Sequence, residues 1–264
     1  MSVTSLDVRT VTLVDHELVD EPLLTLEALA DAADRLPAHL VEHHLADIPR
    51  VLPGGETKVL EQTPGEIVRG IGSNGCWVML TALGRLPEYT PLLTRAAGRY
   101  ELALRARGEK IVGHNLVAFI GAPGATVPVH FDRNHHLLLQ VRGTKTVGTG
   151  HFTDAREQEL QRERGMQFKR LNADRMPDAA EERELGPGQA LVIPAYTFHW
   201  VQGGDDVSIA LTCTATTEST MRDAAVYRFN VKARRWHLPT PPPGRHASLD
   251  LARQRAIAWR DRKR

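Results

Sequence analysis

The sequence has 264 residues, which is ample for one domain with a substantial core and leaves little room for two large ones. Hydrophobic residues make up 42% and charged residues 25%, with 33 Lys and Arg against 32 Asp and Glu, so neither a disordered nor a highly charged chain fits. A net charge of +1 lacks the positive field that non-specific nucleic-acid binding requires. Apolar runs stay well short of the roughly 18 residues that span a bilayer. We expect a cytoplasmic protein with no nucleic-acid or membrane partner.

The first part of the chain, residues 22–105, has mainly helical spacing. Thr25 and Thr63 are good N-cap residues, and Pro64 suits the first position of a helix. This part is therefore predicted to be a helical front end to a single domain that spans residues 1–264.

The hydrophobic pattern changes over residues 111–215, where short apolar or alternating runs are separated by Gly, Pro and Asp. Several short strands at such spacing predict a sandwich or barrel. Within them, the polar segment 154–184 is expected to be an insertion or flap over one mouth of the barrel. After the stiff run PTPPPG, residues 245–260 have helical spacing and predict a C-terminal helix.

The stretch Pro128-Val129-His130-Phe131-Asp132 places an imidazole and a carboxylate two residues apart. Alternate residues of a strand share a face, so both side chains could point into a barrel. His199, which ends the run Gly188 to His199, is the candidate third ligand. Two His and one carboxylate with open positions are typical of non-haem Fe(II) oxygenases, because three sites remain for a chelating cosubstrate and O2. These three residues are our candidate metal-binding and catalytic set.

Lys145 lies fifteen residues after His130, on the strand that follows an Arg-Gly-Thr turn. An ammonium near such a metal can bind the distal carboxylate of a dicarboxylate cosubstrate. Taken singly, the HxD pair could also be a His and an Asp in an exposed turn that bind no metal. Likewise, Lys145 alone could be an ordinary surface lysine of a strand. The order of HxD, lysine and Gly-x5-Pro-x4-His makes the metal interpretation stronger than any one element.

At these residues the sequence resembles the Jumonji-C and cupin-like family of Fe(II)- and 2-oxoglutarate-dependent oxygenases. The matching segments are HFDRNHHLLLQVRGTK and IPAYTFHW, and the resemblance extends over roughly residues 112–215, nearest to bacterial cupin-like members and the asparaginyl hydroxylase branch. It implies a mainly β fold with α, a double-stranded β-helix or jelly roll with N-terminal helices and a C-terminal helix. It also implies that His130, Asp132 and His199 bind Fe(II) and that Lys145 binds the C5 carboxylate of 2-oxoglutarate, with O2 as co-reactant.

The sequence departs from the family pattern at two places. Three residues before the first ligand the family commonly has Thr, whereas this chain has Val127. Thr126, one residue earlier, is retained as a candidate cosubstrate contact. Six residues after the first ligand, the usual Asn is His136, which could donate a hydrogen bond or fill space. Neither change touches a candidate metal ligand.

Further candidates belong to the same pocket or its rim. Thr214 and Asn115 are candidate cosubstrate contacts, with strand packing and a strand-edge amide as the alternatives. Candidate substrate contacts are Arg133, Tyr196 and Trp200, for which a salt bridge at the rim and packing in the core are the alternatives.

Three functions remain open from the sequence. The first is an oxygenase that hydroxylates an amino-acid side chain in a peptide, a protein or a small molecule. The second is a cupin isomerase, epimerase or 2-oxoglutarate-independent dioxygenase, and the third is a non-catalytic metal-binding cupin that acts as a sensor or scaffold. The resemblance also suggests a homodimer through residues 247–260, although that helix could pack on its own domain.

Overall fold

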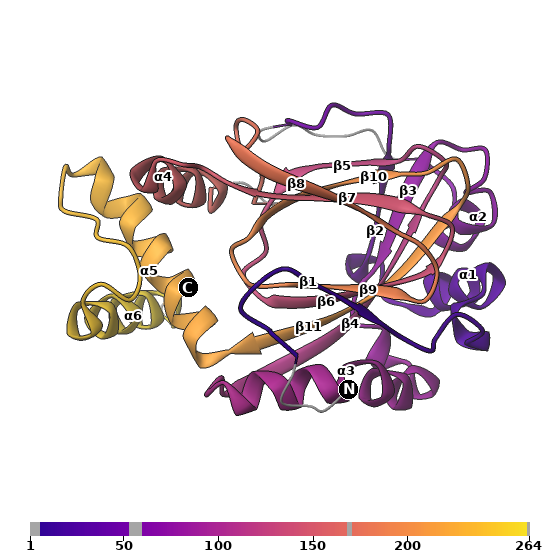
Figure 1. The fold of residues 1–264 in the computed structure, drawn as a ribbon, viewed down its shortest axis with the longest axis horizontal. Helices are drawn as coiled ribbons and strands as arrows, with labels where there is room; N and C mark the ends of the chain where they lie inside the picture. Colours follow the sequence, from indigo (N-terminus) through magenta and orange to yellow (C-terminus); the bar gives the residue numbers. More distant parts are fainter. Residues whose placement is uncertain (1–5, 53–59, 168–170, 263–264) are drawn as a thin grey trace.

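The computed structural model describes residues 6–52, 60–167 and 171–262, which form two antiparallel sheets that face each other (Figure 1). The larger sheet has the order β1-β9-β6-β11-β4-β3-β2, and the smaller has the order β5-β10-β7-β8. The strands of the larger sheet are β1 (Thr12–Asp15), β2 (Val41–Leu45), β3 (Cys76–Leu80), β4 (Ile111–Gly121), β6 (His135–Arg142), β9 (Gln189–Ile193) and β11 (Ser208–Thr217). Those of the smaller sheet are β5 (Thr126–His130), β7 (Lys145–His151), β8 (Ala179–Leu185) and β10 (Phe198–Gly203). The predicted mainly β fold with flanking helices is confirmed.

Helices of the front end cover the outer face of the larger sheet: α1 (Leu26–Arg35), α2 (Pro64–Arg69) and α3 (Thr90–Ala106). The hydroxyl of Thr25 accepts from the amide of Ala28, and Thr63 forms a capping box with Glu66, so both helices begin where the sequence indicates. The front end also contains β2 and β3, which the helical spacing did not indicate, because their pairing with β4 is a tertiary contact.

The two faces of the larger sheet differ in packing. On β4 and β11 the outward side chains are fully buried beneath the helices, namely Leu116, Ala118, Ile120, Leu211, Cys213 and Ala215. The alternate, inward side chains are only half-buried although they lie between two sheets, namely Asn115, Val117, Phe119, Thr212 and Thr214. The inner faces therefore keep accessible space.

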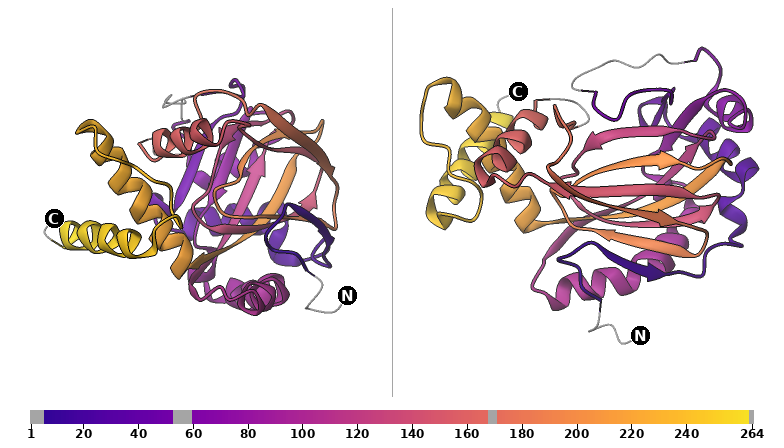
Figure 2. Two further views of the ribbon diagram at one scale, coloured as in Figure 1. Left: turned by 60° about the vertical axis from the view of Figure 1, so that its left-hand side comes forward. Right: turned by 45° about the horizontal axis from the view of Figure 1, so that its top comes forward.

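One end of the sandwich carries the remaining helices, α4 (Ala155–Gly165), α5 (Glu218–Arg235) and α6 (Ala247–Asp261) (Figure 2). Residues 154–184 thus begin with α4 and end in β8, an edge strand of the smaller sheet. The C-terminal helix α6 packs against α5 of the same chain, and buried Arg253 donates to the carbonyl of Pro241. No helix within the described ranges is both long and apolar enough to cross a bilayer.

Candidate metal centre

Two adjacent strands of the smaller sheet bring the three candidate ligands together. His130 ends β5 and pairs directly with His199 of β10, and Asp132 lies two residues beyond His130. The Oδ2 atom of Asp132 is 3.8 Å from Nε2 of His130 and 3.4 Å from Nε2 of His199. The three ligand atoms all lie within 4.8 Å of one another, a spacing that one metal ion could bridge.

Each imidazole is oriented by the carbonyl group two residues before it in the chain. Nδ1 of His130 lies 2.8 Å from the carbonyl oxygen of Pro128, and Nδ1 of His199 lies 2.9 Å from that of Thr197. A carbonyl can only accept, so Nδ1 carries the proton in this arrangement and the lone pair of Nε2 is available. Such second hydrogen bonds are what metal-binding histidines generally make.

The charges at the centre also suit a cation. Burial, together with the neighbouring His199, lowers the pKa of His130 to about 4, so this imidazole is neutral at pH 7. Burial alone would raise the pKa of Asp132, but the imidazoles of His136, His199 and His130 hold it well below its usual range. A carboxylate and a neutral imidazole are the forms in which Asp132 and His130 could bind a divalent metal.

A β-bulge in β5 decides which side chains join this centre. His199 pairs with His130 and Val201 pairs with Val127, so β5 has one extra residue between the two pairs. Both His130 and Val127 therefore face inward. Thr126 pairs with Gln202 on the opposite, outer face, and its hydroxyl donates to Oε1 of that residue. The expectation that Thr126 contacts the cosubstrate is thus wrong for this structure.

The loop before β10 is fixed by Tyr196, whose φ is 63°. Its amide donates to the carbonyl of Asp132 at 2.7 Å, and its own carbonyl accepts from the guanidinium of Arg162 on α4. The Tyr196 ring packs against Phe131 and Tyr227, and its hydroxyl donates to the carbonyl of Thr220. The expected substrate role of Tyr196 is therefore replaced by packing beside the ligands.

Trp200 also lies away from the centre. It follows His199 in β10, so strand alternation places it on the outer face, where it is buried among Phe131, Phe152 and Phe198. Its indole Nε1 donates to Glu182 of β8 at 3.1 Å. The expectation that Trp200 contacts substrate is not met.

Arg133, by contrast, is exposed directly after Asp132 and remains a candidate residue at the rim of the site.

Lys145 begins β7 and is 3% exposed. It lies four residues before Thr149, the cross-strand partner of His199, and so shares the inner face with the centre. Its Nζ is 5.5 Å from the centroid of the Phe119 ring, and among the described residues no carboxylate lies within ion-pair distance of it. Burial lowers the pKa of Lys145 to about 7. An anionic ligand is the partner that this ammonium lacks.

The remaining cosubstrate candidates form one row on the larger sheet. Thr214 of β11 pairs with Asn115 of β4 on one side and with His136 of β6 on the other, so all three side chains face inward. Nδ1 of His136 is 3.3 Å from Oδ2 of Asp132, a contact that the sequence did not reveal.

Arg162 was also not identified from the sequence, because nothing in the sequence of a charged helix distinguishes the arginine that reaches a distant loop.

Comparison with solved structures shows the same fold. The chain is similar to the ribosomal oxygenase YcfD of Escherichia coli in complex with cobalt and 2-oxoglutarate, with a TM-score of 0.53 and 16% identity over 95% of this chain and 63% of that one. An X-ray structure of E. coli YcfD gives a TM-score of 0.54 and 15% identity, with the same 95% and 63% covered. The complex with cobalt and succinic acid gives 0.50 and 15%, covering 95% and 62%. The chain thus spans less than two thirds of these proteins.

Sequence comparison adds the family. The search of curated proteins finds no match to this chain. The family model described as a cupin-like domain matches residues 66–213, which is more than half of the 264 residues and includes all three candidate ligands and Lys145. The chain therefore belongs to the cupin-like domain family, in agreement with the order of its HxD, lysine and PxxxxH elements.

Proposed function

We propose that this protein is an Fe(II)- and 2-oxoglutarate-dependent oxygenase that hydroxylates a C–H bond of its substrate. One observation carries the proposal: a buried lysine with no carboxylate partner in the described structure shares the inner face with two oriented histidines and an aspartate. A metal site alone would suit many cupins. The additional buried cation is what a dicarboxylate cosubstrate requires.

The residues present fit both groups. His130, Asp132 and His199 would hold Fe(II), and Lys145 would hold the distal carboxylate of 2-oxoglutarate, with His136, Thr214 and Asn115 beside it. With the metal, cosubstrate and O2 bound, the centre would supply oxidative decarboxylation to succinate and CO2, coupled to oxygen insertion into a substrate C–H bond.

The chain's own contribution is orientation and exclusion of water. Carbonyl oxygens hold the Nδ1 protons of both histidines, so neither ring is free to present its other nitrogen. Lys145 would keep its Nζ proton once a carboxylate lies against it. An inner cluster that joins the two sheets keeps the space between Lys145 and the centre apolar, and it contains Val147, Leu185, Leu191, Ile193 and Val201.

The substrate would be an amino-acid side chain in a peptide, a protein or a small molecule. The similar E. coli structures are those of a ribosomal oxygenase, which supports a protein or peptide substrate. Arg133 lies exposed beside Asp132, where it could contact such a substrate.

The test is an anaerobic titration of Fe(II)-loaded protein with 2-oxoglutarate, followed by the metal-to-ligand charge-transfer absorption. We expect a saturable band in the wild type and a far weaker affinity in Lys145→Met. Lys110→Met is the matched control, because Lys110 is an exposed lysine paired with Glu218 at 2.5 Å. Absence of the band despite bound iron would favour another cupin chemistry or a non-catalytic role.

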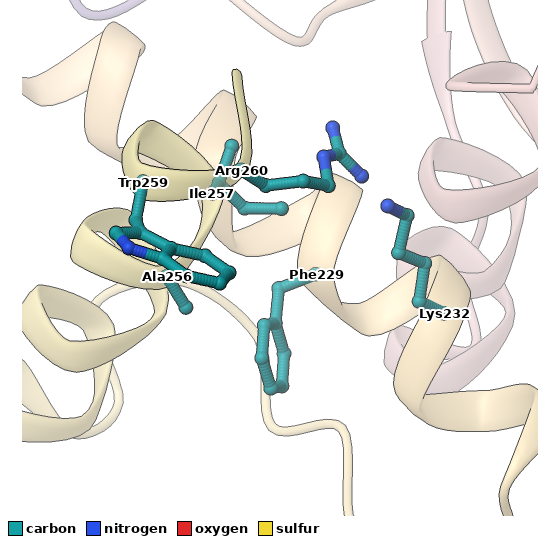
Figure 3. Close-up of a pocket in the computed structure, with 6 residues that line it drawn as sticks. All are labelled: Phe229, Lys232, Ala256, Ile257, Trp259 and Arg260. Atoms are coloured by element: carbon teal, nitrogen blue, oxygen red, sulfur yellow. The ribbon is translucent and has the colours of Figure 1, made fainter. Parts of the chain in front are cut away.

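We also propose a homodimer through the C-terminal helices. A cavity of about 560 Å³ between α5 and α6 is lined mainly by apolar atoms of Phe229, Ala256, Ile257 and Trp259 (Figure 3). Trp236 and Leu238, just after α5, are 79% and 54% exposed. Sedimentation equilibrium of wild type and Trp236→Ser should show a dimer that weakens in the variant; a wild-type monomer at all concentrations would contradict it.

A further inference from the structure

A second cavity, of about 640 Å³, is lined by none of the three candidate ligands but by two direct neighbours of His199. These are Thr149, its cross-strand partner, and Thr197, whose carbonyl oxygen contacts its Nδ1. Its walls come from the ends of β7 and β8, from α4, from the loop before β10 and from the segment that precedes β1. Both β8 and β1 are edge strands of their sheets, so the cavity lies at an edge of the sandwich. Neither Lys145 nor its neighbour Phe119 lines it, which separates it from the cosubstrate pocket.

A row of cross-strand partners connects this cavity to the metal centre. His130, His199, Thr149 and Glu181 lie opposite one another across β5, β10, β7 and β8, so their side chains share the inner face. Thr149 and Glu181 line the cavity. Glu181 is two strands from His199, which corresponds to about 10 Å at the usual strand spacing. A ligand of modest length could reach from one to the other.

The lining carries an excess of positive charge. It contains Arg9, Arg162 and Arg183, against the single carboxylate of Glu181. Arg162 is already occupied, since it donates to the carbonyl of Tyr196 and pairs with Glu159 at 2.8 Å. Arg9 is exposed at the rim. Arg183 is therefore the arginine of the lining that lies on the inner face of the sheet and has a hydrogen-bond donor without a partner among the described residues.

The two terminal nitrogens of Arg183 differ in their partners. Its Nη2 pairs with Glu181 at 2.6 Å, whereas its Nη1 is buried and has no hydrogen-bond partner among the described residues. Burying a charged donor without a partner costs roughly 1–3 kcal/mol or more, so such groups generally have a ligand or water in the functional state. A guanidinium presents a planar fork that matches a carboxylate.

We infer that this cavity binds a carboxylate of the primary substrate, with Arg183 as the specificity-determining residue. The inference rests on the proposed function, because it assigns the substrate class of that site. The substrate is then a carboxylate-bearing molecule or an acidic side chain whose anionic group lies roughly 12 Å from the metal, because Arg183 is two strands across and two residues along from His199. A neutral amide in the same place leaves Nη1 without a charged partner.

The experiment uses Ala179→Cys in the metal-free 264-residue chain, since Ala179 lines the cavity and is half-buried. The two native cysteines are 0% and 1% exposed, so background labelling is low. Rates of modification are compared for a methanethiosulfonate that bears a sulfonate and one that bears a trimethylammonium group. Ala38→Cys, an exposed alanine on a surface turn, is the matched control.

We expect the sulfonate-to-ammonium rate ratio at Ala179→Cys to exceed that at the control by about tenfold, because a cavity focuses its field. Adding Arg183→Met should bring the ratio back to the control, and adding Glu181→Gln should raise it further. Millimolar benzoate should slow the labelling by a neutral maleimide, and benzamide should not.

Equal ratios at the two positions, a ratio unchanged by Arg183→Met, or equal protection by benzoate and benzamide would each overturn the inference. Because the labelling needs neither iron nor 2-oxoglutarate, it is independent of the charge-transfer titration. Loss of the charge-transfer band overturns the proposed function, and loss of charge selectivity overturns the carboxylate site.

Discussion

The amide of Tyr196 donates a 2.7 Å hydrogen bond to the carbonyl of Asp132, which ties the loop before His199 to the chain that carries the other two candidate ligands. The same loop is held from the other side by Arg162, whose Nε and Nη2 are 3.3 and 3.1 Å from the carbonyl oxygen of Tyr196. The position of His199 relative to Asp132 therefore depends on a helix that supplies no ligand.

Replacing Arg162 with methionine should weaken metal binding without removing a ligand. We expect about a tenfold loss of Fe(II) or Mn(II) affinity, at the low end of the effect of removing a ligand's own hydrogen-bond partner, because Arg162 acts on the loop and not on a ligand directly. Arg164→Met is the control in the same helix, since Arg164 pairs with Glu157 and Asp174 at its exposed side. Equal affinities in the two variants, measured by anaerobic titration, would show that Arg162 does not position the loop.

The substitution His199→Ala should abolish iron-dependent succinate release while the protein stays folded. His199 contributes one of only three candidate ligands, and its Nε2 faces Oδ2 of Asp132. Circular dichroism would check the fold, and His39→Ala, at an exposed position, would serve as the control. Iron-dependent 2-oxoglutarate turnover by the purified His199→Ala protein would contradict the assignment.

Lys145→Met should make the ligand-free protein more stable at pH 6. The pKa of Lys145 falls from 10.5 to about 7 on folding because burial disfavours the ammonium. The destabilisation is complete below pH 7, where the lysine is charged in both states, and disappears as pH rises to 10.5. We expect a Tm gain of about 2–4 °C at pH 6, equivalent to roughly 1 kcal/mol or more, that shrinks by pH 9. A lower Tm in the variant at pH 6 would be the opposite result.

The same pKa predicts how 2-oxoglutarate affinity depends on pH. A carboxylate binds the ammonium form, so above pH 7 binding requires uptake of a proton by the free protein. Affinity should be nearly constant below pH 7 and fall about tenfold per unit above it, until the pKa of the bound lysine is reached. Calorimetry at pH 8 in buffers of different ionisation enthalpy measures the proton directly. A pH-independent affinity between 7 and 9 would exclude Lys145 as the partner.

Gly148→Ala should destabilise the smaller sheet. A Cβ at Gly148 would overlap the Trp200 ring, which is buried and held by its bond to Glu182. Such overpacking costs typically about 1–3 kcal/mol, measurable by urea unfolding. At Gly84 a Cβ meets nothing within 4 Å, so Gly84→Ala should change the free energy of unfolding little. Equal stability of the two variants would mean that Trp200 can move aside.

The candidate ligands were predictable because short sequence motifs identify them. His130 and Asp132 lie within three residues of each other, and the PxxxxH element ends at His199. Lys145 was predictable from its spacing within the family pattern. Its burial against Phe119 was not, because that contact joins strands of different sheets.

The errors arose where the direction of a side chain depends on pairing. The bulge in β5 turns the side chain of Val127 inward and that of Thr126 outward. The sequence TVPVH of this strand contains no residue that predicts a bulge. Trp200 is a different case, since alternation from His199 already indicates the opposite face. Arg162 and Arg183 lie in a segment rich in arginine and glutamate, where only the folded chain distinguishes the two that reach the loop and the cavity.

The carbonyl contacts of the two imidazoles have a consequence for engineering. In each case the acceptor lies two residues before the histidine, so the restraint is contained in the segments Pro128–His130 and Thr197–His199. Ring orientation is thus inherited with a tripeptide rather than assembled from distant parts of the molecule. Transplanting these segments and Asp132 into another jelly roll with the same strand pairing should carry the geometry of the centre with them.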